Sequence, residues 1–266
     1  MLHSLVQHIF LKTLYFIMNF IPRIFCLIWV MAIMQSCSDM PNDNQNEQAA
    51  NTINNGNELS EEELLNIVQK QTLKYFWDYA EPNSGMARER FHPDGDYPKN
   101  DSHVVTTGGT GFGLMGIVAG MERGFIPRDL AIKRLNKIAE FLDKTPRFHG
   151  AWPHWINGET GETQAFGRKD NGGDIVETSF LAQGFIVVRE YLKNGSEEEK
   201  EVAAKYDELW KGIEWNWYTN NKDGLYWHWS PDYQWEMDLM IEGYNECLLT
   251  YVMAASSPDH AIDPDV

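Results

Sequence analysis

The chain has 266 residues, 43% of them hydrophobic and 13% aromatic, with 39 acidic against 22 basic side chains and a formal net charge of −17. This apolar and aromatic content excludes intrinsic disorder for the bulk of the chain, and the length suffices for one large domain or two small ones. The acidic excess excludes nucleic acid as an expected partner, because phosphates attract basic surfaces, and it favours an uncharged ligand.

The first 37 residues predict a bacterial lipoprotein signal. Arg23 precedes an apolar run that ends in Ser36-Cys37, and secretory signals place basic, apolar and small residues in this order. Cys37 is then the expected lipidation site, with Met18 as an alternative start of translation and an uncleaved transmembrane anchor as the alternative role. We therefore expect export and lipid anchoring to a bacterial membrane, on its periplasmic or cell-surface side.

Residues 38–57 are rich in Asn, Asp, Gln and Pro and predict a flexible tether to a domain over residues 58–266. Cys26 leaves with the signal and Cys37 carries lipid, so Cys247 stands alone and no disulfide is expected. The spacing of cysteine, histidine and acidic residues matches no known metal-binding loop, so we expect no metal and no cofactor.

Hydrophobic periodicity predicts a mainly α-helical domain. Helices are expected near residues 60–80, 109–123, 127–145, 175–192, 197–215 and 239–255, with short strands at 104–106 and 225–229. The second, fourth and sixth stretches are apolar nearly all round, as helices of an inner layer are, whereas the third and fifth carry more charge. The run Gly111-x-Gly113-x-x-Gly116 resembles a dinucleotide fingerprint, but inside a helix it indicates close helix packing.

Aromatic motifs recur along the chain. Residues 151–155 read AWPHW and residues 226–229 read YWHW, while paired glycines open a helix near both Gly108 and Gly172. A period of about 65–75 residues equals one helix hairpin with a long loop. Inner and outer helices that alternate in this way form an α/α toroid, of which the chain supplies the first three hairpins.

Acidic side chains gather where the fourth helix begins. Asp174 and Glu177 are three residues apart and share a helix face, and Asp170 precedes them. One interpretation is a capping box in which Asp174 caps the helix. The other is catalytic, because Phe180 and Leu181 flank Glu177 at helical spacing, and apolar surroundings raise the pKa of a carboxyl group as a general acid requires.

A second acidic pair, Glu242 and Glu246, lies in the apolar sixth stretch. On one helix such charges repel by about 0.2–0.5 kcal/mol when exposed and by more when buried. A purely structural helix gains nothing from this pair, so Glu246 is expected to be functional, with Glu242 solvated near the helix start as the alternative.

Aromatic loops accompany both acidic groups. Indole faces beside carboxylates are typical of sugar-binding sites, because the C–H face of a pyranose stacks on the ring while its hydroxyls bond to polar side chains. The alternative is that these rings hold the loops together. The expected substrate-binding residues are Trp152, His154, Trp155, Arg88, Trp227, His228, Trp229, Tyr244, Asn245 and Glu242.

Six strings stand in a distinctive order: GMARER (85–90), TTGGTGFG (106–113), HGAWPHW (149–155), DNGGDIVETSF (170–180), YWHWSP (226–231) and GYNEC (243–247). Together they resemble the glycoamylase-like family, also called putative glucoamylases, which is similar to glycoside hydrolase family 144, the endo-β-1,2-glucanases. The resemblance spans about residues 60–260. It implies an (α/α)6 toroid that hydrolyses a glucan with inversion, the β-1,2-linked glucan being best supported.

By this resemblance the catalytic residues are Asp170, Asp174, Glu177 and Glu246. We expect Glu246 or Glu177 to protonate the leaving oxygen and the remaining acids to orient sugar or water. The family's domain is about twice as long as this chain, so the chain corresponds to its N-terminal half, and the catalytic base is expected in either half.

The function expected from the sequence is therefore that of an exported, monomeric glycoside hydrolase acting on a β-glucan. Its partners are the glucan and, through the lipid anchor, the membrane. The alternatives are a non-catalytic glycan-binding lipoprotein, an inactive fragment of a hydrolase, and a hydrolase whose substrate is an α-glucan.

Overall fold

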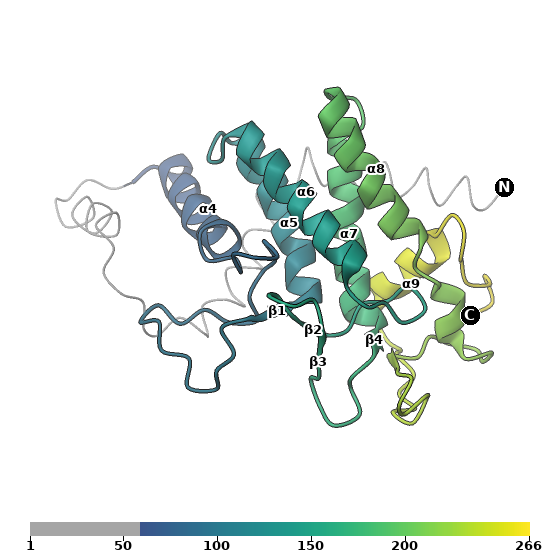
Figure 1. The fold of residues 1–266 in the computed structure, drawn as a ribbon. Coiled ribbons are helices and arrows are strands. Elements are labelled where there is room, and N and C mark those ends of the chain that lie inside the picture. Colours follow the sequence, from purple (N-terminus) through teal and green to yellow (C-terminus); the bar gives the residue numbers. More distant parts are fainter. Residues whose placement is uncertain (1–58) are drawn as a thin grey trace. The chain divides into compact units, whose positions relative to one another are not determined.

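The structure is a computed structural model that describes residues 59–266 (Figure 1). Residues 61–92 and 97–266 form one compact unit. The expected signal, the tether and the lipidation site Cys37 lie outside the described residues. Within residues 59–266, no helix has both the length and the apolar character that crossing a bilayer requires.

The described residues form six α-helices and one short 3-10 helix, which confirms the predicted helical fold. The helices are α4 (Glu61–Trp77), α5 (Thr107–Glu122), α6 (Arg128–Lys144), α7 (Ile175–Leu192), α8 (Glu197–Lys211) and α9 (Cys247–Ser256), with the 3-10 helix η1 at Trp215–Thr219. Five of the α-helices lie close to their predicted positions.

The sixth prediction is wrong at its start, because residues 239–246 are not helical. Gly243 has a φ of +98°, which a right-handed helix excludes, and Met240 forms an isolated antiparallel bridge with Tyr226. Glu242 and Glu246 are both exposed. Glu242 and Glu246 therefore do not repel each other along one helix, contrary to the prediction from the sequence.

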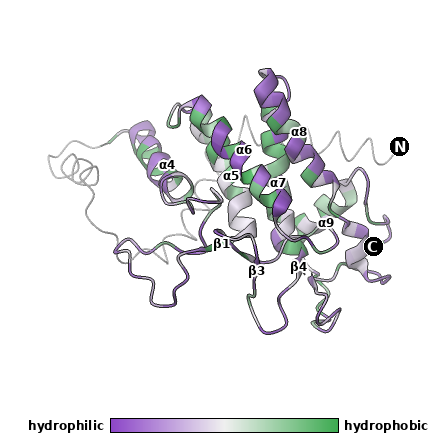
Figure 2. Cartoon of the chain, viewed as in Figure 1, coloured by the Kyte–Doolittle hydropathy of each residue, from purple (hydrophilic) through white to green (hydrophobic). Residues whose placement is uncertain are grey.

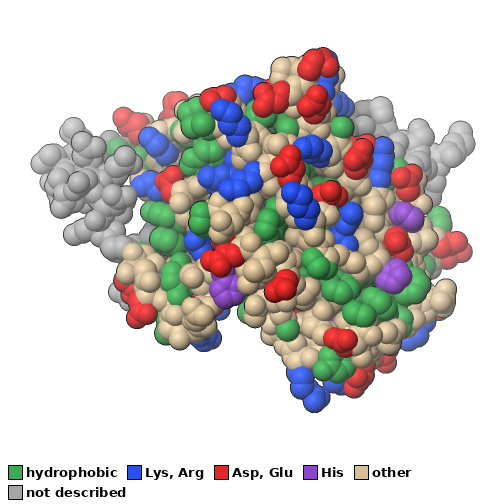
Figure 3. Space-filling model, in the orientation of Figure 1, with side chains coloured by type: hydrophobic (Ala, Val, Ile, Leu, Met, Phe, Trp, Pro, Cys, Tyr) green, Lys and Arg blue, Asp and Glu red, His purple; other side chains and the backbone are tan. Residues whose placement is uncertain are grey.

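The helices form an inner and an outer row, as predicted. The inner helix α7 packs against α5 on one side and α9 on the other, and α6 and α8 pack against each other outside them (Figure 1). Hydrophilic residues are concentrated on α4, α6 and α8, whereas α5 and α9 are mostly neutral to hydrophobic (Figure 2). On the face shown in Figure 3, acidic and basic side chains are interspersed.

Two small antiparallel sheets fix the loops at one end of the inner helices. The strands β1 (Val104–Thr106), β2 (Trp155–Asn157) and β3 (Thr163–Gln164) pair in the order β1-β2-β3, and β4 (Gly173–Asp174) pairs with β5 (His228–Trp229). The strand β1 leads directly into α5, and β4 leads directly into α7. The aromatic strands β2 and β5 are thereby held beside the N-terminal ends of two inner helices.

Glycine allows α5 and α7 to approach closely. A Cβ atom on Gly111 would lie 2.1 Å from the carbonyl oxygen of Phe180, and one on Gly184 would lie 2.6 Å from the carbonyl oxygen of Gly111. Backbone therefore meets backbone at this crossing, where a side chain has no room to relax. The glycine run serves helix packing, as the sequence predicted.

We predict that Gly111→Ala destabilises the fold by about 1–3 kcal/mol or more, because the added methyl group overlaps the backbone of α7. Gly116→Ala is the matched control on the same helix, since its nearest neighbour would lie 3.6 Å away, at Phe76. The control should be neutral or up to about 1 kcal/mol more stable, because alanine favours a helix. Calorimetric melting of both variants checks this, and equal effects would contradict it.

Candidate active site

The carboxylate of Asp174 is fully buried and joins three segments of the chain. Its Oδ1 accepts hydrogen bonds from the backbone N–H groups of Val176, at 3.0 Å, and Glu177, at 2.9 Å, so Asp174 caps α7 as predicted. Its Oδ2 lies 2.7 Å from Nδ1 of His154 and accepts a hydrogen bond of 2.8 Å from Nε1 of Trp227. Because each oxygen has two partners, Asp174 acts as a fixed charge that orients its neighbours.

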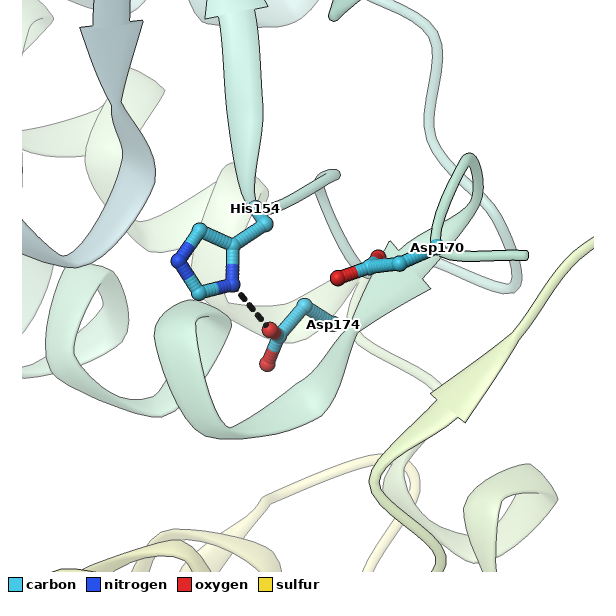
Figure 4. Close-up of side chains that lie close together, drawn as sticks. All are labelled: His154, Asp170 and Asp174. Atoms are coloured by element: carbon cyan, nitrogen blue, oxygen red, sulfur yellow. Dashed lines mark hydrogen bonds and ion pairs between the residues drawn. The ribbon is translucent and has the colours of Figure 1, made fainter. Parts of the chain in front are cut away.

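His154 is held in one orientation by this charge (Figure 4). With Nδ1 donating to Asp174, Nε2 is the free nitrogen and makes no hydrogen bond to any described residue. Burial lowers the pKa of His154, but the bond to Asp174 and the charges of Asp174, Glu177 and Asp170 outweigh it, so the pKa is raised above its ordinary value. His154 therefore offers the site an imidazole that binds a proton more readily than an ordinary histidine does.

Glu177 lies in the first turn of α7 and reaches across to α5. Its Oε2 accepts hydrogen bonds from the backbone N–H of Gly108, at 2.8 Å, and from the hydroxyl of Thr106, at 3.4 Å. The backbone N–H of Asp174 is bonded to the carbonyl of Trp152 instead, so the capping-box interpretation of Glu177 is wrong. Burial and then the charge of Asp174 raise the pKa of Glu177, as its apolar surroundings predicted.

Asp170 is only 3% exposed and points toward Asp174 and His154 (Figure 4). Neither of its carboxylate oxygens has a hydrogen-bond partner among the described residues. The nearest nitrogen, Nε2 of His228 at 3.3 Å, already accepts a hydrogen bond from Gly172 and so presents a lone pair.

Asp170 consequently holds a proton more readily than an ordinary aspartate does. Burial, followed by the charge of Asp174, raises the pKa of Asp170 to about 7. Burial also lowers the pKa of His228 to about 4, so this imidazole is neutral and cannot stabilise an ionised Asp170. A protonated Asp170 can donate a hydrogen bond to a ligand that enters the cluster.

Ligand atoms of His154, Asp170 and Asp174 all lie within 4.8 Å of one another, a spacing that could hold a cation. However, Nδ1 of His154 and Oδ2 of Asp174 are bonded to each other, and a metal ion on these two atoms would have to displace that proton. The absence of a metal therefore stays a prediction.

Some of the predicted aromatic residues lie beside this cluster and are partly exposed. Trp227 bonds to Asp174, and the ring of Trp155 meets that of His154 edge-on, with centroids 5.8 Å apart. Phe166, which the sequence analysis missed, stacks on His154 with centroids 4.1 Å apart and is 48% exposed. Its signal was a lone aromatic ring in the polar loop 158–167.

Two predicted sugar contacts are wrong, because the side chains belong to the core. Trp152 is fully buried and its Nε1 donates to the carbonyl of Leu142, while His228 is 2% exposed and braces the loop before β4. Arg88 is half-buried, with Nε donating to the carbonyl of Tyr79. These side chains therefore hold loops in place from within the protein and do not face a ligand.

In contrast to the buried cluster, the predicted site residues of the segment 242–246 are exposed to solvent, namely Glu242, Tyr244, Asn245 and Glu246. The side chain of Tyr244 is 95% exposed. Still, the first turn of α9 lies near that of α7, because the hydroxyls of Ser179 and Thr250 are 3.0 Å apart. Burial and then the charges of Glu246 and Asp174 raise the pKa of Cys247, which is the neighbour of Glu246 in the chain.

Comparison with known proteins supplies a context for this site, although no family model matches the chain. The chain is 47% identical over 211 residues to an exo-β-1,2-glucooligosaccharide sophorohydrolase (non-reducing end) of Parabacteroides distasonis. The aligned region covers 78% of this chain and 28% of that protein. The chain is also similar to the solved structure of an endo-β-1,2-glucanase from Chitinophaga pinensis in complex with sophorotriose and glucose. The two sequences are 58% identical, the TM-score is 0.76, and the match covers 77% of this chain and 49% of that one. A structure described as a putative glucoamylase from Bacteroides fragilis is 53% identical with a TM-score of 0.76, over 78% and 49%.

The chain thus spans about half the length of these solved relatives and less than a third of the sophorohydrolase. Over that part it shares their fold, so the predicted resemblance to β-1,2-glucanases and glucoamylase-like proteins is confirmed. The predicted fold, about half of an (α/α)6 toroid, is confirmed with it.

The proton on Asp170 predicts a pH-dependent stability. The folded state holds this proton up to about pH 7, whereas an ordinary Asp, with a pKa of 3.8, releases it on unfolding. The contribution of Asp170 to the free energy of unfolding therefore falls as the pH rises from about 4 to about 7 and levels off above that.

Asp170→Asn removes this loss, so its melting temperature relative to the parent chain should rise between those pH values and then stay constant. Glu198→Gln, an exposed position on α8, is the control and should show a constant difference. Thermal melts across the pH range test this, and a constant difference for Asp170→Asn would contradict it.

Asp174→Asn should lower the pKa of His154. The substitution removes the charge that favours the imidazolium and leaves the burial that disfavours it. Titration of the His154 ring by NMR measures the change, with the exposed Asp232→Asn as the control. A His154 pKa that Asp174→Asn leaves unchanged would refute the assigned interaction.

Proposed function

We propose that the chain forms the N-terminal half of the catalytic domain of a β-glucan hydrolase, with β-1,2-linked glucan as its substrate. The carrying observation is the buried cluster of Asp170, Asp174, Glu177 and His154 at the N-terminal ends of two inner helices. Two of the relatives described above are named for hydrolysis of β-1,2-linked glucans, and this supports the choice of linkage. Export and lipid anchoring through Cys37 are part of the same proposal.

The proposed mechanism is inverting hydrolysis by paired carboxyl groups. Such enzymes use one carboxylic acid to protonate the leaving oxygen and one carboxylate to activate water, with the two about 6.5–9.5 Å apart. The raised pKa of Glu177 supports its use as the acid, and Glu246 is the other assigned donor. Asp170 donates a hydrogen bond to the sugar, and Asp174 orients His154 and Trp227.

A non-catalytic glycan-binding lipoprotein is the second candidate. The aromatic side chains of Trp155, Trp227 and Phe166 beside the cluster favour it, because such rings can stack on a sugar whether or not hydrolysis follows.

Incubation of the full chain with linear β-1,2-glucan, and in parallel with an α-1,4-glucan, separates these functions. Hydrolysis predicts new reducing ends from the β-1,2-glucan, whereas binding without new reducing ends would overturn the catalytic proposal in favour of the second candidate. Cleavage of the α-glucan alone would overturn the assigned linkage.

Glu177→Gln and Glu246→Gln should each reduce turnover by about 10²–10⁴-fold, because an amide cannot transfer the proton. Glu198→Gln, exposed on α8 and outside the cluster, is the matched control and should keep full activity. Assays of reducing ends give the comparison, and near-normal turnover in either variant removes that residue from the mechanism.

A further inference from the structure

A cavity of about 320 Å³ lies outside the acidic cluster. It is bounded by η1, by the turn that follows η1, and by the loop between β5 and α9. Its walls include Glu214, Asn216, Trp217, Asn220, Asn221 and Trp235, and none of the acids assigned above. The volume falls within the range of about 300–1,000 Å³ that is typical of small-molecule sites.

Two indole rings form the aromatic wall of this cavity and are held in place. Trp217 is 39% exposed, and its ring stacks on His149 with centroids 3.6 Å apart and planes 14° from parallel. Nδ1 of His149 lies 3.0 Å from the carboxylate of Glu214, which fixes the support. The ring of Trp235 stands 6.2 Å from that of Trp217, at 32°. Because the rings are already ordered, a ligand that stacks on them causes little further loss of side-chain entropy.

The polar wall of the cavity consists of free amides. The side chains of Asn216, Asn220 and Asn221 make no hydrogen bond to any other described residue. Asn220 and Asn221 have φ values of +52° and +55°, so two consecutive left-handed residues build the turn that carries them. Each amide offers donors and an acceptor, which suits the hydroxyl groups of an uncharged ligand.

The negative charge at the cavity and on the chain further limits which kinds of ligand can bind there. The carboxylate of Glu214 lines the cavity, and the chain has a net charge of −17, so an anion is disfavoured. An entirely apolar ligand would leave the amides desolvated without partners, which costs free energy. A molecule with one apolar ring face and a rim of hydroxyls satisfies both walls, and a pyranose has this form.

We infer that this cavity is a second saccharide-binding subsite that holds a pyranose unit of a neutral glucan on Trp217 and Trp235, apart from the acidic cluster. The inference rests on the proposed function for the identity of the glucan. The two sites share the strand β5, because His228 pairs with Asp174 and the ring of Trp229 meets that of Trp217 edge-on, with centroids 6.0 Å apart.

The test measures binding and hydrolysis separately on the full chain, kept in a detergent that contains no sugar. The probes are glucose and sophorotriose, the latter a β-1,2-linked glucotriose, and linear β-1,2-glucan serves as the polymer. Binding is followed by NMR signals of the indole N–H groups, assigned with Trp217→Phe and Trp235→Phe.

Sophorotriose should shift the indole signals of Trp217 and Trp235. Trp217→Ala and Trp235→Ala should each weaken this binding about tenfold, which corresponds to 1.4 kcal/mol. Asn216→Ala should weaken it about 2–10-fold through one lost hydrogen bond, and it keeps the aromatic wall if an alanine variant at Trp217 or Trp235 fails to fold. For the polymer, these variants should raise KM and leave kcat unchanged.

Trp77→Phe is the matched control, because Trp77 lies at the end of α4, outside both sites, with Arg134 over its ring. Binding at Trp217 without any hydrolysis would contradict the proposed function and would support this inference. Hydrolysis with unshifted Trp217 and Trp235 signals, and with an unchanged KM in all three pocket variants, would overturn the inference alone.

Discussion

The buried carboxylate of Asp174 is the interaction on which the rest of this structure depends. Removing a carboxylate from water costs several kcal/mol unless hydrogen bonds and opposite charge compensate for it. Here the compensation comes from the N-terminus of α7, the imidazole of His154 and the indole of Trp227. These partners come from three separate segments, so the loops carrying His154 and Trp227 must converge on the first turn of α7 if the charge is to be buried at all.

The same charge sets the protonation of its neighbours. Burial and then this charge raise the pKa of Asp170 and Glu177, and the charge favours the imidazolium of His154. Burial beside one carboxylate thus keeps a proton on Asp170 up to about pH 7 and raises the proton affinity of His154. Separate roles for otherwise similar carboxyl groups follow from this difference in environment, as general acid–base chemistry requires.

Much of the fold could be predicted because its signals are local. The helix periods, the N-cap at Asp174 and the glycines of α5 each depend on neighbours a few residues away. The start of α9 could not be predicted, since an apolar stretch reads as helix unless the positive φ of Gly243 is known. The capping-box interpretation failed for a different reason, because the carboxylate of Glu177 finds its partner at Gly108, 69 residues earlier in the chain.

The proximity of Asp170, Asp174 and Glu177 could be predicted from the sequence, whereas the burial of the aromatic residues could not. The motif YWHW lies in an extended segment, where successive side chains point in opposite directions, so Tyr226 and His228 are buried whereas Trp227 and Trp229 stay partly exposed. In AWPHW the first three residues are buried, Trp152 among them, and His154 and Trp155 stay partly exposed. The sequence shows both motifs but not which of their side chains are buried, which depends on the pairing of β2 with β1 and of β5 with β4.

The alternation of side chains along an extended segment also explains how the two-residue strand β5 contacts residues of two sites. In β5, His228 lies 3.3 Å from Asp170 and the ring of Trp229 meets that of Trp217 edge-on, so the strand contacts both the acidic cluster and one of the aromatic residues that line the cavity. Its partner Gly173 has no side chain, and a Cβ there would lie 2.1 Å from the hydroxyl of Tyr218. The close pairing that buries Asp174 is therefore the same pairing that places Trp229 against Trp217, which lines the cavity, and the position of each site constrains that of the other.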